Sequence, residues 1–160
     1  MSHALEIING QAQMAYAGEL PWHGLGVQVS NDLTPEQMMQ AAGLDWTVEK
    51  TPLFTNMNGE TLRISGRYAL TRTMDNRVLD IVGGDNWNPT QNSEAFEFFN
   101  DFIAQGGMKM ETAGSLDSGR IVWALAKVED SFELFGQDRI DSYLHFTNFH
   151  KYGFSTDVRF

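Results

Sequence analysis

Hydrophobic side chains recur with the period of an α-helix in two segments of the chain. The first begins at Thr34 and Pro35, because threonine is a favoured N-cap and proline suits the first helical position, and it ends at Gly43. The second begins near Asn92 and ends at Gly106, with apolar residues three and four positions apart. The pattern therefore predicts two short-to-medium helices, each with one buried face.

Alternating apolar and polar positions predict β-strands in most of the remaining chain. We expect strands over residues 46–54, 63–71, 78–82, 109–113, 120–128, 139–149 and 153–160. Turn-forming residues indicate two hairpins, with turns at residues 74–76 and 117–119. Because helices and strands do not alternate regularly, the expected fold class is α+β: a mainly antiparallel sheet with two short-to-medium helices packed on it.

The bulk properties indicate one soluble domain. The chain has 160 residues, of which 42% are hydrophobic, so we expect a single domain over residues 1–160. Residues 158–160 stop inside a strand-like pattern, and this predicts the N-terminal part of a longer protein. No apolar run reaches the roughly eighteen residues of a membrane span, so no membrane partner is expected. The absence of cysteine excludes disulfides and thiolate chemistry and favours a cytoplasmic setting.

The formal net charge of −10 restricts the partners that this chain can attract. Proteins that bind duplex DNA usually present a positive face, so the charge argues against duplex binding. A local basic groove stays open as an alternative, because Arg63, Arg67, Arg72 and Arg77 recur within fifteen residues. A negative surface also steers a protein toward basic protein partners.

Two segments carry candidate binding residues. Residues 21–26 combine proline, tryptophan, histidine and two glycines, which predicts an ordered turn that presents Trp22 and His23. The C-terminal segment interleaves aromatic residues with Arg139, Lys151 and Arg159. Exposed aromatics beside cations can stack bases and hold a single-strand backbone, whereas core filling with cations on the wet face is the simpler alternative. The aromatic residues concerned are Tyr143, Phe146, Phe149, Tyr152 and Phe154.

Catalytic and metal-binding signals are weak. The histidines His23, His145 and His150 match no metal-binding motif, and His145 and His150 are five apart on a strand and should face opposite sides. A bend that lets two strands pack closely explains Ser115 better than a nucleophile does, because no Gly-x-Ser-x-Gly elbow is present. We expect no catalytic residue, no metal and no cofactor, and a non-enzymatic role over an enzymatic one.

Five ordered blocks carry a resemblance to a known family. They are residues 21–26, 42–46, 89–98, 111–126 and 143–150. Together they resemble the phage/plasmid-like protein family, a domain of unknown function of tailed phages, plasmids and prophages. The resemblance implies a mobile-element protein in the host bacterial cytoplasm, and it implies no established reaction. Phe149 and residues 151–154 depart from the small polar residues that members more often have there.

These observations lead to two functional hypotheses. The first is a phage or mobile-element accessory protein in DNA metabolism that binds or anneals single-stranded DNA and forms a homo-oligomer. Its expected nucleic-acid contacts are Trp22, His23, Arg120, Lys151 and Arg159. The alternative is an acidic, non-enzymatic protein-interaction module, either an inhibitor of a host defence factor or an assembly partner of a host or phage protein.

Overall fold

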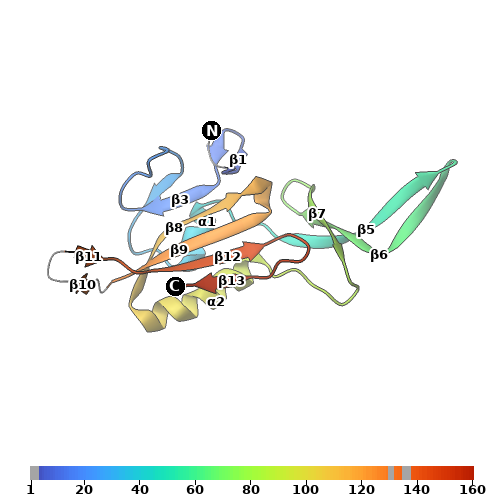
Figure 1. The fold of residues 1–160 in the computed structure, drawn as a ribbon. Helices are drawn as coiled ribbons and strands as arrows, with labels where there is room; N and C mark the ends of the chain where they lie inside the picture. Colours follow the sequence, from blue (N-terminus) through green and yellow to red (C-terminus); the bar gives the residue numbers. More distant parts are fainter. Residues whose placement is uncertain (1–3, 130–131, 135–137) are drawn as a thin grey trace.

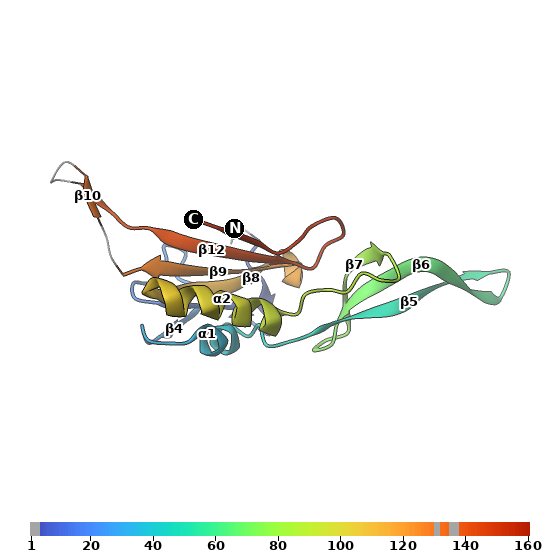
Figure 2. The ribbon, with the colours of Figure 1, turned by 90° about the horizontal axis from the view of Figure 1, so that it is seen from below.

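Two helices lie on one face of a six-stranded sheet, and a long three-stranded arm projects from one end of this body (Figures 1 and 2). This computed structural model describes residues 4–129, 132–134 and 138–160, and within them the expected α+β fold is confirmed. The helices are α1 (Pro35–Ala41), α2 (Asn92–Gly106) and the short 3₁₀ turn η1 (Asp117–Gly119). Neither α-helix is long and apolar enough to span a membrane.

The strands form four sheets within the described residues. In chain order they are β1 (Ile7–Ile8), β2 (Gln11–Ala12), β3 (Met14–Ala17), β4 (Val27–Val29), β5 (Val48–Met57), β6 (Glu60–Arg72), β7 (Arg77–Gly83), β8 (Met108–Leu116), β9 (Ile121–Val128), β10 (Phe132–Leu134), β11 (Asp138–Ile140), β12 (Tyr143–Phe149) and β13 (Asp157–Arg159). The main sheet has the order β13-β12-β9-β8-β3-β4, the arm has the order β5-β6-β7, and β1-β2 and β10-β11 are separate ribbons. All pairings are antiparallel except β3 with β4.

Both helices begin and end where the sequence predicts. The Thr34 hydroxyl accepts a hydrogen bond from Gln37 N at 3.2 Å, and Gln37 Oε1 accepts one from Thr34 N at 2.9 Å, which completes a capping box. Helix α2 ends at Gly107, whose φ of 58° is the left-handed conformation that glycine adopts without strain.

The core forms where small residues of the sheet meet large residues of α2. Strands β8 and β9 direct Ala113, Ala124 and Ala126 toward the helices, and all three are fully buried. Their small side chains let α2 approach the sheet closely, so its Phe96 and Phe99 lie deep in the core. The apolar face predicted for the second helix is therefore the face that holds it on the sheet.

The arm corrects the predicted extent of two strands. The predicted hairpin between 63–71 and 78–82 is present as β6 and β7. Strands β5 and β6 also continue past it to a tight turn at Asn58 and Gly59, whose φ values are 52° and 84°. Asn-Gly is the preferred sequence for such a two-residue hairpin turn, because both positions need a positive φ.

Three further expectations need correction. The strand predicted over residues 139–149 is two strands, because β11 pairs with β10 while β12 pairs with β9. The strand predicted over 153–160 shortens to β13, since residues 151–153 form a turn with Gly153 at a φ of 80°. The short strands β1 to β4 lie on either side of the predicted turn at residues 21–26, where no strand was predicted, because each is too short to show a clear alternation.

A buried ion pair joins the base of the arm to the N-terminal segment and the main sheet. The Arg72 guanidinium donates to both Glu6 carboxylate oxygens, at 2.9 and 3.1 Å, and both residues are almost fully buried. Ser115, at the end of β8, donates its hydroxyl proton to Glu6 Oε2 at 2.8 Å. The second edge of the guanidinium donates to Asp75, and these bonds lower the pKa of that carboxyl.

Gly119 and Trp46 pack closely against this guanidinium. A Cβ on Gly119 would lie 2.5 Å from Arg72 Nη1, so only glycine leaves room for the side chain. The Trp46 ring lies 5.1 Å from the Arg72 guanidinium carbon, which is a cation–π distance. These contacts fix Arg72 from several sides.

His150 belongs to a polar cluster behind the sheet. Asn92 Nδ2 donates to Leu44 O at 2.9 Å, so Asn92 Oδ1 faces His150 and accepts from its Nε2 at 2.9 Å. The ring is fully buried and contacts Trp46 at 5.1 Å between centroids. Burial, together with a smaller effect of the nearby Arg72 charge, lowers the pKa of His150 to about 4. The imidazole is therefore neutral at pH 7.

Replacing Arg72 with methionine should destabilise the protein strongly. The substitution leaves the Glu6 carboxylate buried without its partner, which typically costs about 3–5 kcal/mol. Urea unfolding followed by circular dichroism measures the change. The matched control is Arg77→Met, because Arg77 lies 3.6 Å from the same carboxylate but is half exposed, and exposed pairs contribute about 1 kcal/mol or less. Equal effects of the two substitutions would contradict this assignment.

The buried His150 should make stability depend on pH. The unfolded chain binds a proton on this side chain below its ordinary pKa of 6.5, whereas the folded protein binds it only near 4. Stability should therefore fall by about 3 kcal/mol as the pH drops from 6.5 to 4, and this contribution should be constant above 6.5. His150→Gln keeps a donor for Asn92 and cannot titrate. The variant should therefore lose less stability than the wild type between pH 6.5 and pH 4. Equal losses of stability in the two proteins would show that His150 is not responsible.

Candidate functional site

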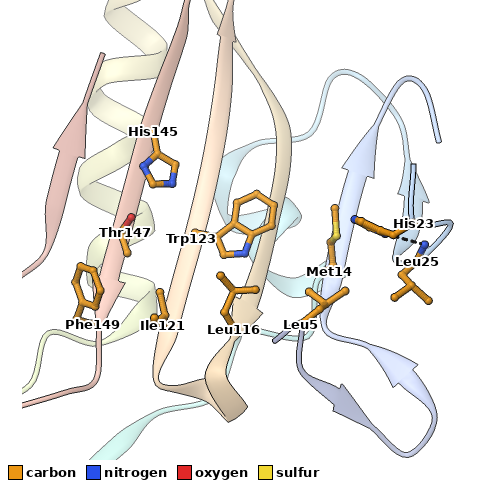
Figure 3. A pocket seen from close by; sticks show the side chains of 10 residues that line it. All are labelled: Leu5, Met14, His23, Leu25, Leu116, Ile121, Trp123, His145, Thr147 and Phe149. Atoms are coloured by element: carbon orange, nitrogen blue, oxygen red, sulfur yellow. Dashed lines mark hydrogen bonds between the residues drawn. The ribbon is translucent and has the colours of Figure 1, made fainter. Parts of the chain in front are cut away.

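The face of the main sheet opposite the helices carries the candidate site. Neither helix covers this face, and the turn at residues 21–26 borders it on one side (Figures 2 and 3). A hollow of about 430 Å³ lies on it, lined mainly by apolar atoms. This volume falls in the range of about 300–1,000 Å³ that is typical of ligand pockets. The lining residues are Leu5, Met14, His23, Leu25, Leu116, Ile121, Trp123, His145, Thr147 and Phe149.

Trp123 occupies the centre of this open face. Strand β9 alternates, so Val122 and Ala124 point to the helices while Trp123 points into the hollow and stays partly exposed (Figure 3). Gly114 is its direct partner on β8, and a Cβ there would lie 3.0 and 3.2 Å from two indole atoms. The absence of a side chain at Gly114 therefore lets the indole lie across the neighbouring strand.

Further rings line the two sides of the hollow. His145 and Phe149 come from β12 on one side, and His23 comes from the turn on the other (Figure 3). Partial burial lowers the pKa of His145, so this ring is a neutral aromatic surface at pH 7. The His23 ring is oriented by a hydrogen bond from Leu25 N to its Nδ1 at 3.1 Å. This arrangement can hold a planar, mostly apolar group against Trp123.

Cations lie at the edges of the open face. Lys127 is four residues after Trp123 on β9 and shares its face, about 13 Å away along the strand. Arg159 pairs with His145 in the β12–β13 register and so lies on this face at the sheet edge. Both cations have carboxylate partners: Lys127 donates to Asp141 at 2.8 Å, and Arg159 pairs with Asp157. Exposed pairs of this kind are weak enough to exchange a carboxylate for a phosphate.

The structure places the predicted contacts Trp22 and His23 together. Their rings meet edge to face at 5.4 Å, and His23 lines the hollow while Trp22 is 80% exposed beside it. The predicted turn thus presents both side chains, as the glycines and the proline indicated.

Arg120 and Lys151 form a second group at the end of the sheet where η1 lies. Lys151 pairs with Asp117 at 2.6 Å, and Arg120 pairs with the same carboxylate at 3.6 Å and with Asp80 at 3.7 Å. The hydrogen bond from Lys151 lowers the pKa of Asp117. The five predicted contacts therefore divide into Trp22 with His23, Arg120 with Lys151, and Arg159 at the far edge.

Some of the C-terminal aromatic residues fill the core, and others are exposed. Core filling and exposed stacking were the two alternatives that the sequence left open. Phe146 is fully buried against α2, so core filling is correct for this residue. Tyr143 and Phe149 lie on the open face, and Tyr152 and Phe154 are each more than half exposed. The side chain of Arg139 lies outside the described residues.

The other chemical candidates have structural partners. His145 and His150 face opposite sides of the sheet, as predicted. Ser115 is buried and bonded to Glu6, so it is a core hydrogen-bond donor. Within the described ranges, no group of three or more histidine or acidic side chains is arranged to hold a metal ion.

Sequence reasoning missed Trp123 and Gly114 as site residues. The signal was present in residues 121–126, where large side chains occupy one set of alternate positions and small ones occupy the other. A strand with apolar residues on both faces looks like an ordinary core strand. Only the helix positions show that the small residues are covered and the large ones are open.

Comparison with protein families matched residues 78–160 to the family described as a domain of unknown function (DUF932). The matched segment includes β7, α2 and the strands from β8 to β13, and it therefore includes Trp123, His145 and Phe149. No curated protein and no solved structure matched the chain. Because the match covers more than half of its 160 residues, the chain belongs to the DUF932 family.

Proposed function

We propose that this protein binds single-stranded DNA on the open face of its main sheet, as an accessory protein of a phage or another mobile element in the host bacterial cytoplasm. One observation carries the proposal: the partly exposed indole of Trp123 lies across Gly114 in an uncovered hollow. Every base has a π face, so stacking on an aromatic side chain tolerates any sequence. Sheets with aromatic residues on an open face stack two or three bases in RNA-recognition modules.

The proposed strand path crosses the sheet from the turn to the opposite edge. Trp22 and His23 stand at its start, Trp123 and His145 lie in its middle, and Arg159 lies at its end. Four strand spacings separate β3 from β13 in the sheet order, which is about 19 Å. Arg120 and Lys151 lie at the η1 end of the sheet and are proposed to hold phosphates beyond this path.

The net charge of −10 determines how such binding can work. At long range this net charge repels the phosphates, and the edge cations already have carboxylate partners. Stacking must therefore supply most of the affinity, and only a few phosphate contacts can contribute. Duplex DNA hides its base faces, so it should bind poorly. Annealing of complementary strands would additionally require two bound strands to be brought together.

An acidic protein-interaction module is the second candidate. Residues outside the arm carry a net charge of −11, whereas residues 48–83 carry +1. This concentration of negative charge on the body favours a basic protein partner. Failure of the protein to bind any oligonucleotide would favour this candidate.

Replacing Trp123 with alanine should weaken single-strand binding by about 5- to 150-fold, because stacking contributes about 1–3 kcal/mol per base. Fluorescence anisotropy of a labelled oligonucleotide of about eight nucleotides measures the affinity, with the matching duplex as comparison. This length engages one protomer. Trp123→Phe should keep part of the affinity, since it retains a ring.

The matched control is Phe98→Ala, which removes a half-exposed ring from α2 on the covered side of the sheet. It should bind like the wild type. Equal losses in Trp123→Ala and Phe98→Ala, or unchanged binding in Trp123→Ala, would contradict the proposed site.

Arg159→Ala should reduce the salt dependence of binding. Each phosphate neutralised on a single strand contributes about 0.7 to the slope of log affinity against log salt concentration. Titrations between low and physiological salt should show a slope smaller by about that amount in the variant. An unchanged slope would remove Arg159 from the interface.

A further inference from the structure

The outer part of the arm has no protein neighbour in the described structure. Strand β7 pairs with β6 only from Arg67 onward, so residues 53–64 form a two-stranded ribbon that we call the distal hairpin. It projects away from the body in both views (Figures 1 and 2). A two-stranded hairpin alone in water is marginally stable at best, which indicates that a partner covers it.

The distal hairpin exposes large apolar side chains. Phe54 is 57% exposed and lies directly opposite Arg63 in the β5–β6 register, so an aromatic ring and a cation share one face. Leu62 and Ile64 are 46% and 40% exposed and lie on the other face. Within the described residues Arg63 makes no ion pair with a carboxylate.

The outer flank of α2 has the complementary chemistry. Phe98 and Phe102 are 52% and 38% exposed, and their rings meet edge to face at 5.2 Å. Glu94 precedes Phe98 by one helical turn, and Asp101 lies next to Phe102 in the chain. Helix α2 contains three acidic residues and no basic one, so the charges that the helix itself places beside this apolar pair are all negative.

We propose that the distal hairpin of one copy docks on the outer flank of α2 in a second copy of this chain. Phe54 would pack against Phe98 and Phe102, and Arg63 would face Glu94 and Asp101. The two surfaces match in both apolar and charged character, and they belong to the same chain. They do not meet within one copy, because the arm points away from α2 (Figure 2).

The proposed contact is heterologous, because one copy contributes its distal hairpin and the other copy contributes its α2 surface. Repetition of a heterologous contact closes into a ring or extends as a filament. The contact leaves the open face of the sheet free, because α2 lies on the opposite face. The proposal therefore does not depend on single-strand binding.

The test uses two variants that each disable one surface. The hairpin variant carries Phe54→Ala and Arg63→Glu, and the helix variant carries Phe98→Ala and Asp101→Ala. Light scattering after size exclusion should show concentration-dependent assembly of the wild type above its chain mass of 18.0 kDa. Loss of central contacts should weaken self-association by about 30-fold or more, so each variant alone should stay at the chain mass.

An equal mixture of the two variants is the decisive sample. One intact helix surface and one intact hairpin remain in that mixture, so it should form heterodimers of twice the chain mass and nothing larger. A face-to-face contact between two hairpins could not give this result, because one hairpin is disabled. A mixture that stays at the chain mass would overturn the proposal.

Two further outcomes would also overturn it. One is a wild-type protein that stays at the chain mass at the highest concentration reached. The other is a helix variant that assembles like the wild type. Leu62→Ser is the matched control on the opposite face of the same hairpin and should assemble normally. All substituted side chains are exposed, so the variants should fold, and far-UV circular dichroism is the measurement that checks this.

Discussion

The buried ion pair between Arg72 and Glu6 holds three separate segments of the chain together. Through it the base of the arm, the N-terminal segment and the end of β8 meet at one carboxylate. A buried charge is tolerated only when its partner and its hydrogen bonds are complete. Arg72 therefore couples the position of the arm to the position of the sheet, and Gly119 is needed because the guanidinium fills the space beside it.

Small residues make room for large aromatic rings on both faces of the main sheet. On the covered face, alanines leave room for α2 and its phenylalanines. On the open face, glycine at position 114 leaves room for the indole of Trp123. In both places a small residue makes a close approach of a large ring feasible, but only the second ring remains accessible. The same strands thus supply a stable layer on one face and the proposed binding surface on the other.

The charge distribution separates the two proposed interactions. The body is strongly acidic and the arm is slightly basic, so the arm of one copy and the body of another are complementary in charge, as the proposed assembly requires. The same acidity opposes attraction to phosphates, so the proposed binding of a single strand would depend mainly on stacking. Because the hairpin and α2 lie away from the open face, assembly and strand binding can occur together.

Local signals determined much of this fold. The threonine and proline at the start of α1 and the glycines at the helix ends fixed the helices, and the turns at residues 74–76 and 117–119 fixed two hairpins. Each of these signals acts over a few neighbouring residues, so the sequence alone contains it. The Asn58-Gly59 turn was equally local and was overlooked.

Other features were decided only by the tertiary structure. Which face of β9 is covered depends on where α2 packs, and α2 is joined to that sheet through contacts distant in sequence. The division of the five predicted contacts into three groups likewise depends on segments far apart in the sequence. So does the burial of Arg72 beside Glu6, which lies 66 residues away in the chain. Local patterns in the sequence predicted both helices, most of the longer strands and two of the hairpin turns. The tertiary structure decided which side chains are buried and which are open, because burial depends on packing between segments that no local pattern encodes.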